Sequence, residues 1–233
     1  MKNKILLLGA MPLMLTTVAH AQWRVGATIG TSANHYRMDR QYMSDYHIND
    51  RWGLTMGVTG QYDFTEWLGV RADFNWTQKN HRVLRDRIPM DYKYVNNYLQ
   101  LPVMASFSFG GQKLRGFCNL GVYGGYWLSS NYSGVDYNSF VGAPYDVKGH
   151  VDFNSDRDQR WDCGFVGGLG VEYRFARHWG AQVEARYYYS TTSVQKQYMR
   201  VSDYRYHSTL GLQAGVSYFF YFFFFFFFFF FFF

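Results

Sequence analysis

The chain has 233 residues, a length that suits one domain or at most two small ones. Aromatic side chains make up 22% of it and charged ones 17%, a composition that excludes a disordered protein. Two cysteines are too few for a disulfide scaffold, and a formal net charge of +6 is too mild to indicate a nucleic-acid binder. Outside its two ends the chain has no apolar stretch long enough for a transmembrane helix.

The first 21 residues have the three parts of a secretory signal peptide in the correct order. Lys2 and Lys4 form the positive segment, Ile5 to Ala19 is apolar, and Ala19-His20-Ala21 is a small-residue cleavage site. A membrane anchor is the alternative, but the segment is short and ends in small residues. We therefore expect residues 1–21 to be removed on export, and no cysteine follows the site to suggest a lipoprotein.

The rest of the chain alternates between apolar residues and residues that are polar, charged or glycine. Residues 68–77 show the pattern clearly, and a period of two predicts a β-strand. Eight such runs occur, at 22–32, 51–63, 67–78, 95–109, 114–128, 161–175, 179–190 and 206–220.

The connections between these runs alternate in length. The short connections are 64–66, 110–113 and 176–178, and the long ones are 33–50, 79–94, 129–160 and 191–205. This pattern predicts an all-β fold, a transmembrane antiparallel up-and-down β-barrel of eight strands with short periplasmic turns and long extracellular loops. A ten-stranded count is the alternative if 129–160 hides a further hairpin. We interpret Val135 to Val141 instead as a rise of the neighbouring strands above the membrane.

A soluble barrel would also alternate, so the nature of the two faces decides between the classes. The face opposite the apolar one is rich in glycine, for example at Gly57, Gly168 and Gly215, as a narrow barrel interior requires. Tryptophans gather near the run ends, as in the aromatic girdles of membrane barrels. They are Trp23, Trp52, Trp67, Trp76, Trp127, Trp161 and Trp179.

Three segments resemble a known family. They are Asn97 to Val103 (NYLQLPV), Gly164 to Phe175 (GFVGGLGVEYRF) and Gly211 to Phe220 (GLQAGVSYFF). They are similar to the PorT-like outer-membrane β-barrel family of Bacteroidota, over essentially all of 22–220. The resemblance implies the outer membrane of a gram-negative bacterium and insertion by the barrel-assembly machinery, guided by an aromatic last strand. Some members of that family assist the assembly of a secretion system.

Charged residues on the inward face are expected to fill the lumen rather than line a pore. Eight strands leave an interior barely wide enough for side chains, so charges there must pair. The expected network surrounds Glu184, with Arg71, Arg174 and Arg186 as its partners. The inward set comprises Arg24, Arg71, Asp73, Glu172, Arg174, Glu184 and Arg186.

The second long connection is basic and is a candidate contact for lipopolysaccharide phosphates on the outer leaflet. An ordinary charged loop is the alternative. The candidate residues are Lys79, Arg82, Arg85, Arg87 and Lys93.

No catalytic, cofactor or metal site is predicted. Histidines, acids and a serine lie in or near the long connections, but no spacing among them matches a nucleophile motif. Asp152 to Asp158 resembles the start of a calcium loop, yet it lacks the required glycine and the final glutamate. The catalytic candidates, interpreted as ordinary surface residues, are His35, His47, His81, His150, His207, Asp45, Asp50, Asp86, Asp152 and Ser208.

Three local features carry expectations of their own. Pro102 lies inside a run, so a bulge or a local break is expected there. Cys118 and Cys163 should sit on the order of 20 Å apart on antiparallel strands, too far for a disulfide. Residues 221–233 are a poly-Phe tail with no period, which we expect to be an artefact or unstructured.

The prediction for function is a non-enzymatic outer-membrane barrel whose loops contact lipid, lipopolysaccharide or an unknown protein partner. Many tyrosines in the long connections suit protein recognition, since tyrosine offers contact area at a low entropy cost. A narrow porin-like pore is the alternative, and so is an accessory factor in secretion-system assembly. An enzyme at the rim is the third class.

Overall fold

The computed structural model describes residues 22–38, 46–85, 87–196 and 205–221, which form ten β-strands. No helix in these ranges is long and apolar enough to cross a membrane. The expected signal peptide and the Phe run at 222–233 lie outside the described residues. The strands are β1 (Gln22–Met38), β2 (Tyr46–Asp63), β3 (Leu68–Gln78), β4 (His81–Arg85), β5 (Met90–Gly110), β6 (Leu114–Asn138), β7 (Ala143–His150), β8 (Trp161–Arg174), β9 (Trp179–Ser190) and β10 (Arg205–Tyr221).

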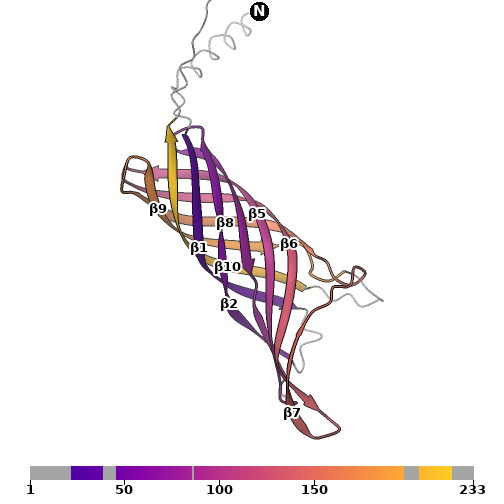
Figure 1. Ribbon diagram of the computed structural model, residues 1–233. Helices are drawn as coiled ribbons and strands as arrows, with labels where there is room; N and C mark the ends of the chain where they lie inside the picture. The colour runs from indigo at the N-terminus through magenta and orange to yellow at the C-terminus, as the bar shows by residue number, and fades with distance from the viewer. Residues whose placement is uncertain (1–21, 39–45, 86, 197–204, 222–233) are drawn as a thin grey trace, which may run out of the picture.

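Eight of the ten strands close into a barrel, in the ring order β1-β2-β3-β5-β6-β8-β9-β10 (Figure 1). Every pairing is antiparallel, and β1 closes on β10 from Gln22↔Tyr221 to Met38↔Arg205. The predicted eight-stranded barrel is confirmed. Its strands pair in chain order except where β4 and β7 interrupt the sequence, as in an up-and-down barrel.

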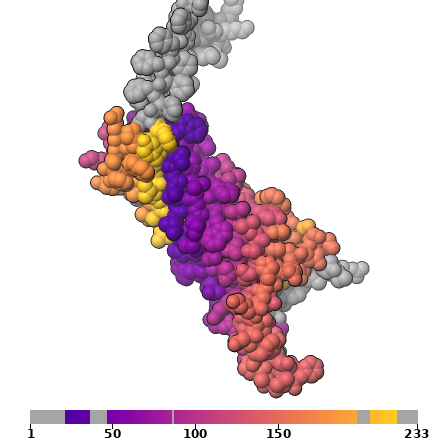
Figure 2. All heavy atoms as spheres, in the orientation of Figure 1, coloured from indigo at the N-terminus to yellow at the C-terminus, as the bar shows by residue number. Residues whose placement is uncertain are grey.

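The two extra strands extend one end of the barrel beyond the closed ring. β4 lies between β2 and the start of β5, and β7 forms a hairpin with the end of β6. Figures 1 and 2 show this hairpin projecting far from the barrel body. We call β4, β7 and the strand segments paired with them the extracellular extension.

Two predicted loops, 79–94 and 129–160, therefore contain strands. The rise of the chain beyond residue 128 is observed, and it belongs to a hairpin that stays outside the ring. Sequence alternation missed these strands because both faces of the extension meet water or polar groups. Period two in hydrophobicity appears only where one face is apolar.

Burial along the strands is the reverse of that in a soluble protein. Apolar side chains face outward, with Ile29 58% and Phe165 61% exposed, while charged Arg71 and Arg186 are 2% and 0% exposed inside. This arrangement puts an apolar band outside and a polar lumen inside, as in an outer-membrane barrel. The outward tryptophans mark the two interfaces, with Trp23, Trp67 and Trp179 at the short-turn end. Trp52 and Trp161 mark the opposite end.

Trp127 departs from the girdle predicted for it. It pairs with Tyr98 across the β5–β6 ladder and stacks on that buried ring with 5.7 Å between centroids. A register shift between Asn97 and Tyr98 follows, which leaves Leu128 as the extra residue of a bulge. Trp127 thus belongs to the wall of the barrel mouth.

Glycines on the inner face leave space in the lumen for the side chains of other residues. A Cβ placed on Gly168 would collide with the Glu184 carboxylate, and one on Gly57 would collide with the Asn75 side chain. These positions need glycine because side chains from other strands fill the space above them. The prediction of small residues on the crowded inner face is confirmed at both sites.

The local predictions for Pro102 and the cysteines also have an outcome. Pro102 and its neighbour Leu101 have no partner in the β3–β5 ladder, while the register is the same on both sides, so a local break occurs without a bulge. Cys118 pairs with Leu169 and Cys163 with Gly124. The two thiols are free, as predicted, because six residues of strand separate the two pairs.

Candidate functional site

The centre of the lumen holds four charged residues from two opposite sides of the ring. Arg71 and Asp73 come from β3, and Glu184 and Arg186 from β9, four places away in a ring of eight. Arg186 lies 2.6 Å from Asp73 and 2.6 Å from Glu184, while Arg71 lies 2.9 Å from Asp73. We call these four residues the central cluster. Its ion pairs cross the interior and join the two walls.

A second group lies toward the short turns. Arg24 on β1 is 2.7 Å from Asp63 on β2 and 2.5 Å from Glu172 on β8. Arg174 is 3.0 Å from Glu172, and its guanidinium lies 4.4 Å from the Phe219 ring centroid. The expected pairing of Arg174 with Glu184 is therefore not formed. Arg174 and Glu172 are two residues apart on one face of β8, which brings their side chains together.

A third buried pair closes the outer mouth. Lys79 Nζ lies 2.5 Å from Asp162 Oδ2, and Asp162 also accepts a hydrogen bond of 2.6 Å from Ser190. The Lys79 ammonium sits 4.8 Å from the Tyr98 ring centroid and 5.5 Å from that of Tyr123. A cation held between two aromatic faces and one carboxylate is a well-satisfied buried charge.

The position of Lys79 differs from the sequence prediction, which placed it in an exposed loop among the lipopolysaccharide contacts. Its side chain is 0% exposed and points into the mouth. The alternation could have indicated this inward position. Asn75 and Thr77 lie on the inner face of β3, and Lys79 is the next residue in the same phase. Asp162 likewise precedes Gly164 in phase on β8, and sequence reasoning missed both members of the pair.

The remaining basic candidates do not form one loop patch. Arg82 on β4 donates two hydrogen bonds, of 2.7 and 2.6 Å, to Asp91 on β5, and these hold the pKa of Asp91 below its ordinary value. Arg85 ends β4, and Arg87 lies in the turn that follows. Lys93 lies on β5, exposed on the same outer face as Arg82.

Two of the candidate histidines pack into the mouth of the barrel, contrary to their interpretation as surface residues: His207 is buried and His81 is half-buried. His207 is 2% exposed, and Asn34 lies 2.9 Å from its Nδ1. His81 stacks between Tyr36 and Tyr94, with ring centroids 4.8 and 4.9 Å away. Both complete the aromatic wall of the mouth, where packing explains their presence.

The other catalytic candidates are dispersed. His35 lies 3.1 Å from Asp50 on the outside, and His150 lies 2.7 Å from Asn131. The exposed His47 lies on β2 and the buried Ser208 on β10, while Asp45 and Asp86 lie outside the described residues. Among the described candidates, no serine contacts both a histidine and an acid, the arrangement that nucleophilic catalysis needs.

The segment that resembles a calcium loop is held by its own side chains. Asp158 accepts hydrogen bonds of 2.9 and 3.0 Å from Arg157 and one of 2.9 Å from the Asn154 backbone. Asp152 also belongs to this loop, between β7 and β8. Within the described ranges no group of three or more His, Cys, Asp or Glu side chains is placed to hold a metal ion.

His81 should make the stability of the protein depend on pH. Burial, with Arg205 and Arg51 nearby, lowers its pKa from the ordinary 6.5 to about 4. The unfolded chain therefore takes up a proton first, so the free energy of unfolding should fall as the pH drops from about 6.5 to about 4. Urea unfolding in lipid vesicles at several pH values should show this slope. His81→Phe, which keeps the ring stack, should make this slope shallower by the share of one histidine, and an unchanged slope in the variant would contradict the assignment.

A closed antiparallel ring with an apolar exterior and a charged lumen decides the class of protein. A family model described as "Outer membrane protein beta-barrel domain" matches residues 17–195. The chain belongs to this family. It is an outer-membrane β-barrel protein, while no curated protein sequence matches it significantly.

The chain is similar to solved structures of outer-membrane barrels. OprG from Pseudomonas aeruginosa is 12% identical, with 87% of this chain and 97% of that chain covered and a TM-score of 0.51. Neisserial surface protein A is 13% identical, with 84% and 96% covered and a TM-score of 0.47. Ail of Yersinia pestis is 13% identical, with 85% and 99% covered and a TM-score of 0.41. At these identities the likeness concerns the fold.

Proposed function

We propose that this protein is a non-enzymatic outer-membrane barrel with a closed lumen, and that its extracellular extension is the surface that contacts partners. The observation that carries the proposal is the combination of ion pairs across the lumen with a long projecting hairpin. The central cluster and the Lys79–Asp162 pair occupy the interior at two levels. The hairpin carries exposed polar and aromatic groups away from the barrel body (Figure 1).

The tip of the β6–β7 hairpin suits contact with a partner. Phe140 is fully exposed and Val141 is 73% exposed in the turn. Covering these exposed aromatic and branched side chains with another surface lowers the free energy, because apolar area leaves water.

A photoreactive cross-linker at position 140 in intact outer membranes tests this role. A defined cross-linked neighbour that is lost in a hairpin-shortened variant supports the proposal. The matched control carries the cross-linker at position 112, in the exposed turn at the opposite end. Identical patterns from the two positions would contradict it.

A narrow pore is the second candidate, because some lumen groups lack protein partners. The side-chain amides of Asn75 and Gln100 are buried without a hydrogen-bond partner among the described residues. Water in the lumen would satisfy them. A few trapped waters and a continuous conducting path differ in their electrical behaviour.

Planar-bilayer recordings separate the two candidates. We expect the wild-type barrel to give no steady conductance steps, because Arg186 bridges the lumen to Asp73. Arg186→Ala should give resolvable steps several-fold above that background. Arg177→Ala, in the exposed turn after β8, is the control and should behave as the wild type does. Steady ohmic steps from the wild-type protein would favour the pore.

The finer placement of the protein is part of the same proposal. The quoted motifs support a PorT-like barrel of a gram-negative Bacteroidota outer membrane, exported by a cleaved signal peptide and inserted by the barrel-assembly machinery. A role as an accessory factor in secretion-system assembly is compatible with the projecting extension. Intact mass of the protein from its native membrane tests the cleavage after Ala21.

A further inference from the structure

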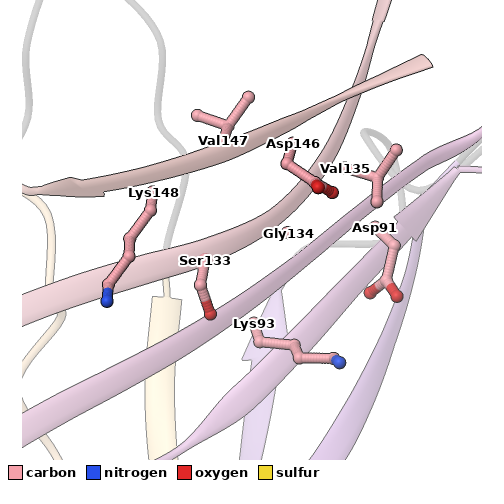
Figure 3. A pocket seen from close by; sticks show the side chains of 8 residues that line it. All are labelled: Asp91, Lys93, Ser133, Gly134, Val135, Asp146, Val147 and Lys148. Atoms are coloured by element: carbon pink, nitrogen blue, oxygen red, sulfur yellow. The ribbon is translucent and has the colours of Figure 1, made fainter.

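Two exposed lysines lie in one row across three strands of the extracellular extension. Lys93 on β5 pairs in register with Ser133 on β6, which pairs in turn with Lys148 on β7. Residues directly opposite one another on adjacent strands point to the same side of a sheet. Figure 3 shows these three side chains on one side, with Val147 pointing to the other.

This row faces outward from the barrel axis. Asn96 and Tyr98 on β5 are buried in the lumen at 2% exposure, so the odd-numbered residues beside them face away. Lys93 and Lys148 are exposed, and neither has an ion pair or hydrogen bond among the described residues. Arg82, the neighbouring cation, is already engaged by Asp91.

The row lies above the outer aromatic girdle. Leu99 pairs with Tyr126, whose ring contacts the girdle residue Trp161 at 5.1 Å between centroids. Lys93 is six residues further along β5, about 20 Å of strand, or roughly 14 Å in height at a tilt of about 45°. That height exceeds the phospholipid headgroup layer and corresponds to the sugars of an outer-leaflet glycolipid.

The residues around the row enclose a small open cavity of about 340 Å³. Asp146 on β7 lines it one step farther from the membrane than Lys148 and has no ion pair among the described residues. The cavity therefore offers two ammonium groups and a hydroxyl near the membrane. Beyond them lie two carboxylates, Asp91, whose charge Arg82 already balances, and Asp146, which is open as an acceptor. A volume of this size suits a single sugar ring.

We infer that Lys93, Ser133, Lys148 and Asp146 form a binding site for a phosphorylated sugar of the outer-leaflet glycolipid. The two ammonium groups and the Ser133 hydroxyl hold the phosphate, and the Asp146 carboxylate accepts hydrogen bonds from sugar hydroxyls. The inference deepens the proposed role of the extension. It moves the expected lipopolysaccharide contact from the loop around Arg85 and Arg87 to the outer face of the β5–β6–β7 sheet.

Binding of soluble probes to the purified full-length barrel tests the site. Glucose 6-phosphate should bind, glucose should not, and inorganic phosphate should bind more weakly than the phosphosugar. The double variant Lys93→Gln/Lys148→Gln should bind glucose 6-phosphate at least tenfold more weakly. Asp146→Asn should weaken the phosphosugar several-fold and leave inorganic phosphate unchanged. Equal affinity for the two anions, or no effect of either variant, overturns the inference.

A second set of measurements identifies the source of the phosphate. Nanodiscs that carry a phosphorylated glycolipid should retain it with the wild-type barrel and lose it with the double variant. The same glycolipid after removal of its phosphates should not be retained. Lys196→Gln, an exposed lysine elsewhere at this end, is the matched control and should retain the glycolipid. An equal loss in that control would mean general charge attraction and overturn the site.

These outcomes are independent of the proposed partner contact. The substitutions leave Phe140 and Val141 unchanged, so cross-linking at the hairpin tip can succeed where phosphosugar binding fails. The reverse pattern would remove the protein-partner role and leave the glycolipid site standing.

Discussion

Glu184→Gln is expected to lower the free energy of unfolding by about 3–5 kcal/mol, the cost of breaking a buried ion pair. Glu184 lies 2.6 Å from Arg186 and 3.4 Å from Arg71, and it accepts a hydrogen bond of 2.9 Å from Asn119. Glutamine keeps the volume and removes the charge, which leaves two guanidinium groups in the lumen with only Asp73 between them. Urea unfolding in lipid vesicles measures the loss.

Two further variants separate this effect from a general defect of folding. Glu66→Gln, in the exposed turn between β2 and β3, should change the free energy of unfolding by less than about 0.5 kcal/mol. Arg71→Met added to Glu184→Gln removes the excess positive charge and should recover part of the stability. A double variant whose cost equals the sum of the single costs would show that the charges do not act as one cluster.

Asp162→Asn should have the next largest effect, again about 3–5 kcal/mol of unfolding free energy. Lys79 is fully buried, and Asp162 is the carboxylate that faces its ammonium at 2.5 Å. The rings of Tyr98 and Tyr123 stabilise the cation but cannot replace a full negative charge. The expected measurement is a lower urea midpoint together with an unchanged slope.

Removing the orphaned cation should reverse the loss. Lys79→Met in the Asp162→Asn background fills the same space without a charge, and we expect it to restore most of the stability. Asp50→Asn on the outside is the matched control, since that carboxylate is exposed and lies 3.1 Å from the exposed His35. If the double variant were no more stable than Asp162→Asn alone, the attribution to an unpaired buried lysine would be wrong.

At the charged positions, the sequence specifies the face on which each residue lies but not its ion-pair partner. The inward orientation of Arg71, Glu184 and Arg186 followed from alternation alone, because period two assigns each residue to a face. Which inward charges pair did not follow. Asp73 pairs with both Arg71 and Arg186, and Asp63 pairs with Arg24, contacts that alternation does not specify. Pairing depends on strand stagger and on which strands lie opposite in the closed ring.

In the extracellular extension, even the strands themselves could not be predicted from the sequence. Residues 131–150 pair as regularly as the membrane strands do, yet their side chains give no apolar stripe. Both faces of this hairpin lie above the membrane, so hydrophobicity has no reason to alternate there. The row of Lys93, Ser133 and Lys148 joins residues 15 to 55 positions apart and exists only through the register of three strands.

The class of fold, the number of strands in the ring and the inward or outward face of the membrane residues can all be derived from the sequence. Lipid outside and a narrow interior inside require apolar residues to alternate with polar or small ones, and this alternation is visible in the sequence. The folded barrel alone shows the ion pair of Lys79 with Asp162, the ion pair of Arg174 with Glu172, and the extension that β4 and β7 form. These are contacts between segments far apart in the chain, set by ring closure and strand register, and no local pattern of residues encodes them.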